Sequence, residues 1–336
     1  MAPKVKESAL PSGAPNKIRE EPTSGINELP DDAALPALAA IRSCGLAGAM
    51  PTLGLGDCSV QLLMRRYHSG RRAAVEARAG PHHFALKLYA EDPSAEAAVH
   101  EALAAAGLAG DSGVRVPPLI AWDRRLRVLV IGWLDGPSVA DLIKSGQGEH
   151  AGELAAHWFH RAASVEVKLG PPLGAARMLE RARKWAAVVV AADPALESAA
   201  TTAVTMLART QPEERAPRLV NGGLYADHVV DLGDGPGVID WGRFGQGPAE
   251  LDAGIFLATT WRVGFRDESA AAEAARAERA FLGRTAGFLD QRARAWHQAA
   301  ELLRFAKRVD GRTGTWPAGA RLTLLREAAR LAETAK

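Results

Sequence analysis

Hydrophobic and polar positions divide the chain into two parts of different character. Between residues 60 and 131, apolar residues alternate with polar ones over short runs, which is typical of half-buried strands. A Gly-Pro turn separates two of these runs and indicates antiparallel pairing. One helix interrupts the series, with Ser94 as its expected N-cap and Gly107 at its end. The predicted strands are 60–67, 72–78, 84–89, 119–122 and 126–131.

After residue 136 the pattern changes to the periodicity of amphipathic helices. Strand patterns in this half are short, and a further helix is expected at 34–46, before the first strand. The fold class predicted is therefore α+β, a small antiparallel sheet followed by a mainly helical region. The predicted helices are 137–144, 150–168, 173–192, 196–210, 249–262, 268–288, 290–308 and 318–334, and the short strands are 218–220, 228–232 and 236–239.

The chain is predicted to consist of a tail and two lobes. Residues 1–33 are rich in Pro, Ser, Gly, Lys and Glu without apolar periodicity, so we predict a disordered tail. The predicted N-lobe covers 34–135 and contains the sheet. The predicted C-lobe covers 136–336 and contains most of the helices.

Composition narrows the classes of function. Hydrophobic residues make up 47% and charged residues 24% of the 336 residues, and the net charge is +2. Such a balance lacks the basic excess of nucleic-acid-binding proteins. Two cysteines form neither a disulfide framework nor a zinc site, which favours the cytoplasm. No apolar run approaches the ~18 residues of a membrane span, and the N-terminus lacks the apolar core of a secretory signal.

Three charged residues stand where an enzyme would handle phosphate and metal. Lys87 lies in mid-strand, where a cation either holds phosphates or is simply exposed. A carboxylate on the following helix would pair with it, and Glu96 fits better than Glu101. Asp240 follows an apolar strand and precedes Trp241-Gly242. A carboxylate in that position can bind Mg²⁺, which prefers one or two carboxylates plus phosphate oxygens, or can form a turn.

The segment from Asn221 to His228 carries a resemblance to a known family. It reads Asn-Gly-Gly-Leu-Tyr-Ala-Asp-His and is followed by two valines. It resembles the catalytic loop of aminoglycoside phosphotransferases and choline kinases, His-Gly-Asp-Leu-His-Pro-Gly-Asn, and a variant that ends Tyr-Pro-Asp-Gln. Leu224, Tyr225 and Asp227 match the variant. The resemblance implies a bilobal protein kinase-like fold over residues 50–310.

The loop departs from the family at its catalytic positions. Gly223 replaces the aspartate that positions the acceptor hydroxyl and takes its proton, and glycine has no side chain to do either. Asn221 replaces the first histidine, and His228 stands where the family has a metal-binding Asn or Gln. Asp227, four residues after Gly223, is a candidate for a substitute base.

Other residues of the chain match further site positions of the family, in the same order along the sequence. Backbone groups of the hinge at Trp133 and Leu134 would meet adenine, while Lys87 with Glu96 would hold phosphates. Asp240 is the implied metal ligand, with His228 beside it. Asp252 resembles a downstream aspartate that braces the catalytic loop, although charge early in a helix explains it equally well. The glycines of Leu53-Gly-Leu-Gly-Asp57 give a weak nucleotide loop.

The resemblance implies an ATP- and Mg²⁺-dependent transfer of phosphate to the hydroxyl of a small molecule. Because Gly223 removes the base, two functions stay open: a phosphotransferase in which Asp227 or a substrate group replaces it, or an inactive pseudokinase. The pseudokinase would bind nucleotide and act through a protein partner. The fold could also serve another transfer, such as nucleotidyl transfer, and a structural or interaction protein with no nucleotide at all is a further possibility. The acceptor, unidentified from sequence, would be held by helices within 150–210 and 250–330, where the tryptophans are expected mostly in the core.

Overall fold

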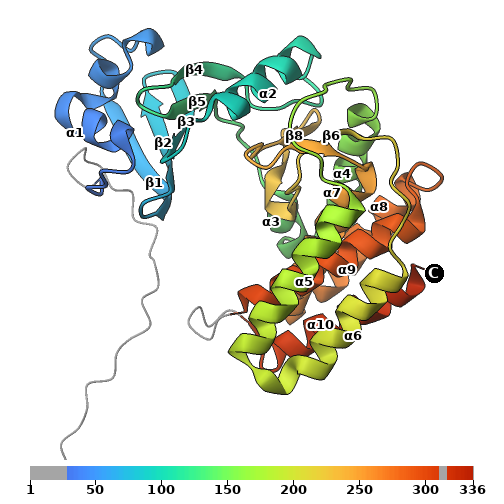
Figure 1. The fold of residues 1–336 in the computed structure, drawn as a ribbon. Helices are drawn as coiled ribbons and strands as arrows, with labels where there is room; N and C mark the ends of the chain where they lie inside the picture. The colour runs from blue at the N-terminus through green and yellow to red at the C-terminus, as the bar shows by residue number, and fades with distance from the viewer. Residues whose placement is uncertain (1–28, 310–315, 336) are drawn as a thin grey trace, which may run out of the picture.

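The computed structural model describes residues 29–309 and 316–335 as two lobes joined through the segment 132–138 (Figure 1). The N-lobe is built on an antiparallel five-stranded sheet of order β1-β2-β3-β5-β4. This arrangement confirms the predicted α+β class and the small antiparallel sheet. The strands are β1 (Val60–His68), β2 (Arg72–Ala79), β3 (His82–Tyr89), β4 (Leu119–Asp123) and β5 (Val128–Gly132).

The two faces of the sheet receive different helices. Successive residues of a strand point to opposite faces, so Leu86 and Leu88 share one face while Lys87 and Tyr89 share the other. The first face packs against α1 (Pro36–Ala49) in a buried apolar core. The opposite face packs against α2 (Ser94–Ala105), as Figure 1 shows. The alternation of β3 therefore directs Lys87 towards α2.

Two local predictions in the N-lobe need correction. Ser94 is not the N-cap of α2 but its first residue, and its backbone N–H donates to the Asp92 carboxylate at 2.9 Å. The predicted tail boundary at residue 33 is also wrong, because Leu29 is buried and Asp32 accepts hydrogen bonds from the Tyr67 hydroxyl and the Gly70 N–H. The rest of the predicted tail, residues 1–28, lies outside the described residues.

The C-lobe consists of helices packed around two apolar cores. Trp158 belongs to one core and Trp296 to the other, and both are buried, as expected for tryptophans at helical positions. Within the described ranges, none of the helices is long and apolar enough to cross a bilayer. The helices are α3 (Val139–Lys144), α4 (Gly148–Ala162), α5 (Ala175–Ala192), α6 (Glu197–Arg209), α7 (Ala249–Arg266), α8 (Ala271–Arg284), α9 (Gln291–Arg308) and α10 (Ala320–Thr334).

Two short antiparallel strand pairs carry the loops that face the N-lobe. In the first, β7 (Val229–Asp231) pairs with β8 (Pro236–Val238). In the second, β6 (Arg218–Val220) pairs with β9 (Gly245–Gly247). Strand β9 is absent from the sequence prediction because Gly-Gln-Gly has no β-propensity. Its glycines are needed for close packing, since a Cβ at Gly245 would lie 2.5 Å from a backbone oxygen.

Candidate functional site

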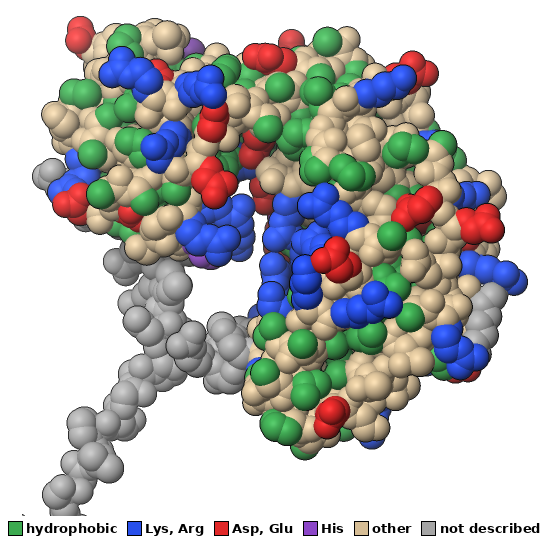
Figure 2. Space-filling model, in the orientation of Figure 1, with side chains coloured by type: hydrophobic (Ala, Val, Ile, Leu, Met, Phe, Trp, Pro, Cys, Tyr) green, Lys and Arg blue, Asp and Glu red, His purple; other side chains and the backbone are tan. Residues whose placement is uncertain are grey.

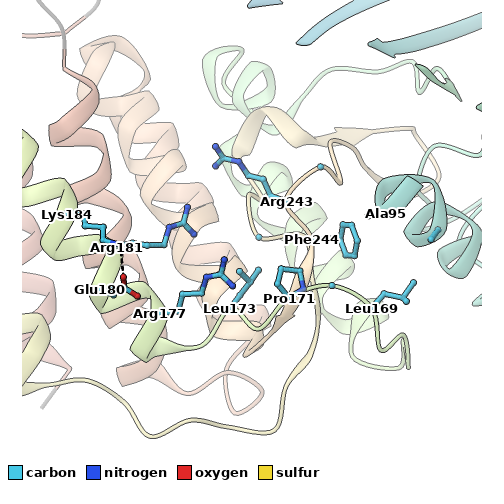
Figure 3. A pocket seen from close by; sticks show the side chains of 14 residues that line it. Ala95, Leu169, Pro171, Leu173, Arg177, Glu180, Arg181, Lys184, Arg243 and Phe244 are labelled. Carbon is cyan, nitrogen blue, oxygen red and sulfur yellow. Dashed lines mark hydrogen bonds and ion pairs between the residues drawn. The ribbon is translucent and has the colours of Figure 1, made fainter. Parts of the chain in front are cut away.

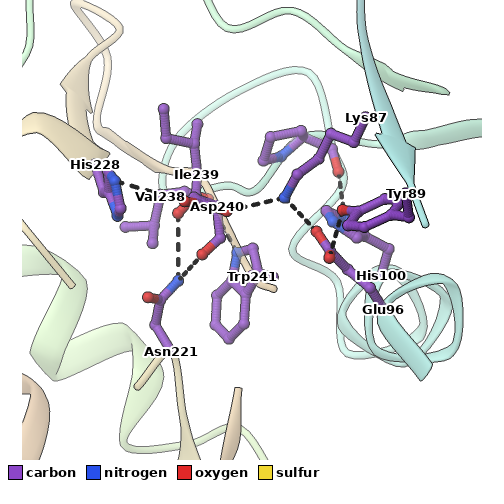
Figure 4. A network of polar contacts seen from close by, with 11 residues as sticks. Lys87, Tyr89, Glu96, His100, Asn221, His228, Val238, Ile239, Asp240 and Trp241 are labelled. Carbon is purple, nitrogen blue, oxygen red and sulfur yellow. Dashed lines mark hydrogen bonds and ion pairs between the residues drawn. The ribbon is translucent and has the colours of Figure 1, made fainter. Parts of the chain in front are cut away.

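Lys87 lies at the centre of a polar network between the lobes (Figure 4). Its ammonium group donates to Glu96 in the first turn of α2 and to Asp240 Oδ1 at 2.9 Å. The Tyr89 hydroxyl donates to the second Glu96 oxygen at 2.7 Å. Glu101, the alternative partner considered from the sequence, is exposed. Burial opposes the charge of Lys87, but the neighbouring carboxylates outweigh it and hold its pKa well above the ordinary value.

Asp240 connects this network to the C-lobe. It follows β8 and has a left-handed backbone with φ of 58°, which Asp tolerates better than most residues. Its Oδ2 faces His228 Nε2 at 3.7 Å. Burial alone would raise the pKa of Asp240, but the Lys87 ammonium beside it lowers that pKa far below its usual range. The carboxylate is therefore ionised and available to a cation.

His228 has the orientation of a metal-ligating imidazole. Its Nδ1 lies 2.8 Å from the Gly223 carbonyl oxygen, which can only accept, so Nδ1 carries the proton. Burial lowers the pKa of His228, and the neutral ring then presents an Nε2 lone pair towards Asp240. A backbone carbonyl commonly fixes the tautomer of metal-binding histidines in this way.

Asp240 and His228 fit a metal that takes most of its ligands elsewhere. Among the described residues, no group of three or more His, Cys, Asp or Glu side chains could hold a metal ion. Two protein donors suit Mg²⁺, which keeps several waters and binds substrate phosphates. Such a site would leave its other ligand positions to waters and phosphate oxygens.

A cavity of about 300 Å³ opens beside this network. Lys87, Asp240 and His228 line it together with the hinge residues Trp133 and Leu134. The predicted glycine loop at 53–57 precedes β1 and is not part of the lining. Three arginines of the β1–β2 hairpin line the cavity instead: Arg65, Arg66 and Arg72. The structure thus brings the sequence-predicted nucleotide and metal residues around one pocket.

Asp252 holds the loop that precedes Gly223. Its carboxylate accepts from the N–H groups of Asn221 at 2.7 Å and Gly222 at 2.9 Å. The Asn221 amide in turn donates to the Asp240 carbonyl at 3.2 Å. Burial raises the pKa of Asp252 to about 7 although both N–H bonds lower it. The bracing role considered from the sequence is therefore present, and Asp252 also lies in the first turn of α7.

Replacing Asp252 by Asn is expected to lower the free energy of unfolding by about 1–3 kcal/mol, because an amide NH₂ would face a buried N–H donor. Urea denaturation of the full chain measures this change. Asp267→Asn is the matched control, since this carboxylate caps an exposed turn after the same helix and Asn caps equally well. Equal stability of both variants would contradict the bracing role.

An arginine occupies the space beside Gly223. A Cβ built on Gly223 would lie 3.1 Å from Arg243 Cδ. The Arg243 guanidinium extends past it and donates to the Tyr225 hydroxyl at 3.0 Å. Asp227 is more than half exposed and lies 3.7 Å from Arg262 of α7. It lines neither of the cavities described here, so its role as substitute base stays a prediction.

A second cavity, of about 870 Å³, lies beside the loop that follows Asp240 (Figure 3). Gly222, Gly242 and Arg243 line it from the loops, and α5 lines it from the C-lobe. Its basic residues are not among the site residues predicted from the sequence. Their spacing on α5, at 177, 181 and 184, is the one local signal that would have placed them on a common face.

Comparison with known proteins supports the resemblance. The model of a family described as "Phosphotransferase enzyme family" matches residues 64–302. None of the curated proteins matches the chain.

Solved structures share the bilobal fold at low identity. A choline/ethanolamine kinase family protein from Mesorhizobium loti superimposes with a TM-score of 0.52 at 15% identity, over 81% of this chain and 92% of that one. A mutant of aminoglycoside phosphotransferase APH(4)-Ia, solved with ADP and hygromycin B, gives 0.56 at 14% identity, over 84% and 96%. Plasmodium vivax ethanolamine kinase gives 0.52 at 10% identity, over 80% and 82%. With the family model matching most of its length, the chain belongs to the phosphotransferase enzyme family.

Proposed function

We propose that this protein binds an ATP–metal complex in the 300 Å³ cavity and transfers the terminal phosphoryl group to a small-molecule hydroxyl. The observation that carries the proposal is Lys87, which contacts both Glu96 of the N-lobe and Asp240 of the C-lobe. That contact joins a phosphate-binding cation to a metal-binding carboxylate across the two lobes. Two structural relatives were solved with ADP or GDP, which supports nucleotide binding by this fold.

The residues predicted from the sequence for this site each have a definable task in this proposal. Lys87, aimed by Glu96, would bind nucleotide phosphates, and Trp133 with Leu134 would border the base. The Trp133 ring is held for this by stacking on His83, with ring centroids 4.7 Å apart. Asp240 and His228 would hold the metal, which when bound neutralises phosphate charge.

The glycine at 223 predicts a slow transfer. General-base assistance typically contributes about 10²–10⁴-fold to a rate. Phosphoryl transfer depends mostly on positioning and electrostatic stabilisation, so the remaining residues can still accelerate it. The proposal is therefore an enzyme with a low turnover, in which Asp227 or a group of the substrate receives the proton.

A second candidate is a nucleotide-binding module that performs no transfer. It is favoured by Arg243, whose side chain lies where a catalytic carboxylate would extend from position 223. Incubation of the full chain with ATP, divalent metal and a panel of hydroxyl compounds decides between the two, with ADP formation as the readout. Metal-dependent thermal stabilisation by ATP without ADP formation would establish the module. Absence of stabilisation by ATP would reject both functions.

The histidine at the metal position is expected to favour Mn²⁺ over Mg²⁺. Imidazole suits transition metals better than Mg²⁺, so the half-saturating concentration for ATP binding should be about tenfold lower for Mn²⁺, or about 1.4 kcal/mol. Thermal-shift titration of ATP with each metal measures this. His228→Asn restores the oxygen ligand of the family and should narrow the difference. An unchanged Mn²⁺/Mg²⁺ ratio in His228→Asn would show that His228 does not bind the metal.

A further inference from the structure

The larger cavity has a cationic wall. Arg177, Arg181 and Lys184 follow one another on the same face of α5, and Arg243 faces them from the loop after β8 (Figure 3). Glu180 is the one acidic residue of the lining, and it pairs with Lys184 at 2.6 Å. Arg177, Arg181 and Arg243 therefore leave the cavity with an excess of positive charge.

The direct contacts given for these three arginines within residues 29–309 and 316–335 are to neutral groups. Arg177 donates to the Pro172 carbonyl oxygen at 2.9 Å, and Arg243 donates to the Tyr225 hydroxyl. Arg181 lies over the Trp185 ring, 5.4 Å from its centre. Burial and then the charge of Arg243 lower the pKa of Arg181. Glu301 offsets this effect on Arg181 only in part, so the guanidinium groups still repel one another.

More positive charge lies behind this wall. Arg304 of α9 is buried and stacks against the Tyr225 ring at 5.3 Å, with Glu301 as its ion-pair partner at 2.7 Å. Burial, Arg308 and Arg181 lower the pKa of Arg304 to about 8. One buried carboxylate cannot neutralise this many guanidinium groups. Figure 2 shows basic side chains gathered on both sides of the opening between the lobes.

We infer that the larger cavity binds a small polyanion bearing carboxylate or phosphate groups, and that this compound is the phosphoryl acceptor. The second part rests on the proposed function. Guanidinium forks match both groups in bidentate geometry, and like charges held together are relieved by an anion. Asp240 lines the first cavity while Gly242 and Arg243 line the second, so the ligand would lie next to the nucleotide phosphates. A polycationic aminoglycoside or choline would meet repulsion here.

Calorimetric titration of the full chain in metal-free buffer tests the site. Citrate probes carboxylate binding and inorganic pyrophosphate probes phosphate binding, while kanamycin and choline are the cationic comparisons. We expect both anions to bind and both cations to fail. Arg177→Ala/Arg181→Ala should weaken anion binding by at least about tenfold. The matched control is Arg183→Ala, which removes an exposed arginine of α5 that lies outside the cavity lining.

Each outcome decides for or against the inference. Equal anion binding by the wild type and the double variant, or an equal loss in Arg183→Ala, would overturn it. Kanamycin binding more tightly than citrate would overturn it as well. The role as acceptor is tested with 3-phosphoglycerate, a hydroxyl compound with both anionic groups, against glycerol: faster ADP formation with the anion is expected. If anions bind while metal–ATP does not, the proposed function fails and the anion site stands.

Discussion

Asp240→Asn is expected to weaken metal-dependent ATP binding by about 100-fold, or about 2.8 kcal/mol. The ionised carboxylate is the one acidic side chain that both lines the nucleotide cavity and touches Lys87. Asparagine tolerates the left-handed backbone of this position, so the variant removes charge without forcing the loop to change. The loss should therefore appear in binding rather than in folding.

Calorimetric titration with ATP, once with Mn²⁺ and once with EDTA, separates the part of the ATP affinity that depends on the metal from the part due to direct contacts between protein and nucleotide. In EDTA the variant should bind at least as well as the wild type, because Lys87 no longer shares its charge with Asp240. Asp234→Asn is the control, since this carboxylate lies on the same β7–β8 hairpin and pairs with Arg115 outside the cavity. Wild-type affinity for Mn²⁺–ATP in Asp240→Asn would remove Asp240 from the metal site.

The arrangement of Lys87, Glu96 and Asp240 in the cleft was predictable because short-range patterns determine it. The two-residue period of β3 directs Lys87 to the face that α2 covers, and the first turn of α2 presents Glu96 to it. Asp240 follows an apolar strand directly, so its place at the strand end required no knowledge of distant contacts. Residue order and element type were enough for this half of the site.

The cationic wall could not be predicted, because it depends on how α5 is docked. The Gln246 side chain of β9 donates to the carbonyl oxygens of Val167 and Leu169, and Gly245 allows close approach of Pro171. These contacts fix the segment that leads into α5. None of them is visible in β9 itself, whose sequence lacks strand propensity. The arginine spacing alone is equally compatible with a solvent-exposed helix face.

The position of Arg243 next to Gly223 could not be predicted from the sequence either. The missing aspartate is visible in the sequence, but Arg243 stands twenty residues later and reaches position 223 only because the loop after β8 turns back. Asp227 shows the opposite case, in which nearness in the sequence does not place a residue in the cavity. Its closeness in sequence favoured it as a substitute base, yet the structure pairs it with Arg262 at the surface.

Gly223→Asp is expected to raise ATP hydrolysis, with water as acceptor, by about 10²-fold. The backbone of Gly223 does not have positive φ, so aspartate can adopt it. The nearest obstacle to its Cβ is the flexible Arg243 side chain at 3.1 Å, which can move aside. The Arg243 guanidinium would lower the pKa of the new carboxylate and make it a weaker base. We therefore expect a rate enhancement at the lower end of the usual range for a general base.

Gly223→Asn is the control, because it has the same shape and no basic oxygen to take a proton. Release of ADP, followed in a coupled assay with Mn²⁺–ATP, should rise in Gly223→Asp and stay at the wild-type level in Gly223→Asn. Adding Arg243→Ala to Gly223→Asp should raise the rate further by restoring the basicity of the carboxylate. If Asp and Asn at position 223 give equal rates, the missing base is not what limits this protein. The rate would then be limited by the cationic residues around the loop, which in our proposal bind an anionic ligand.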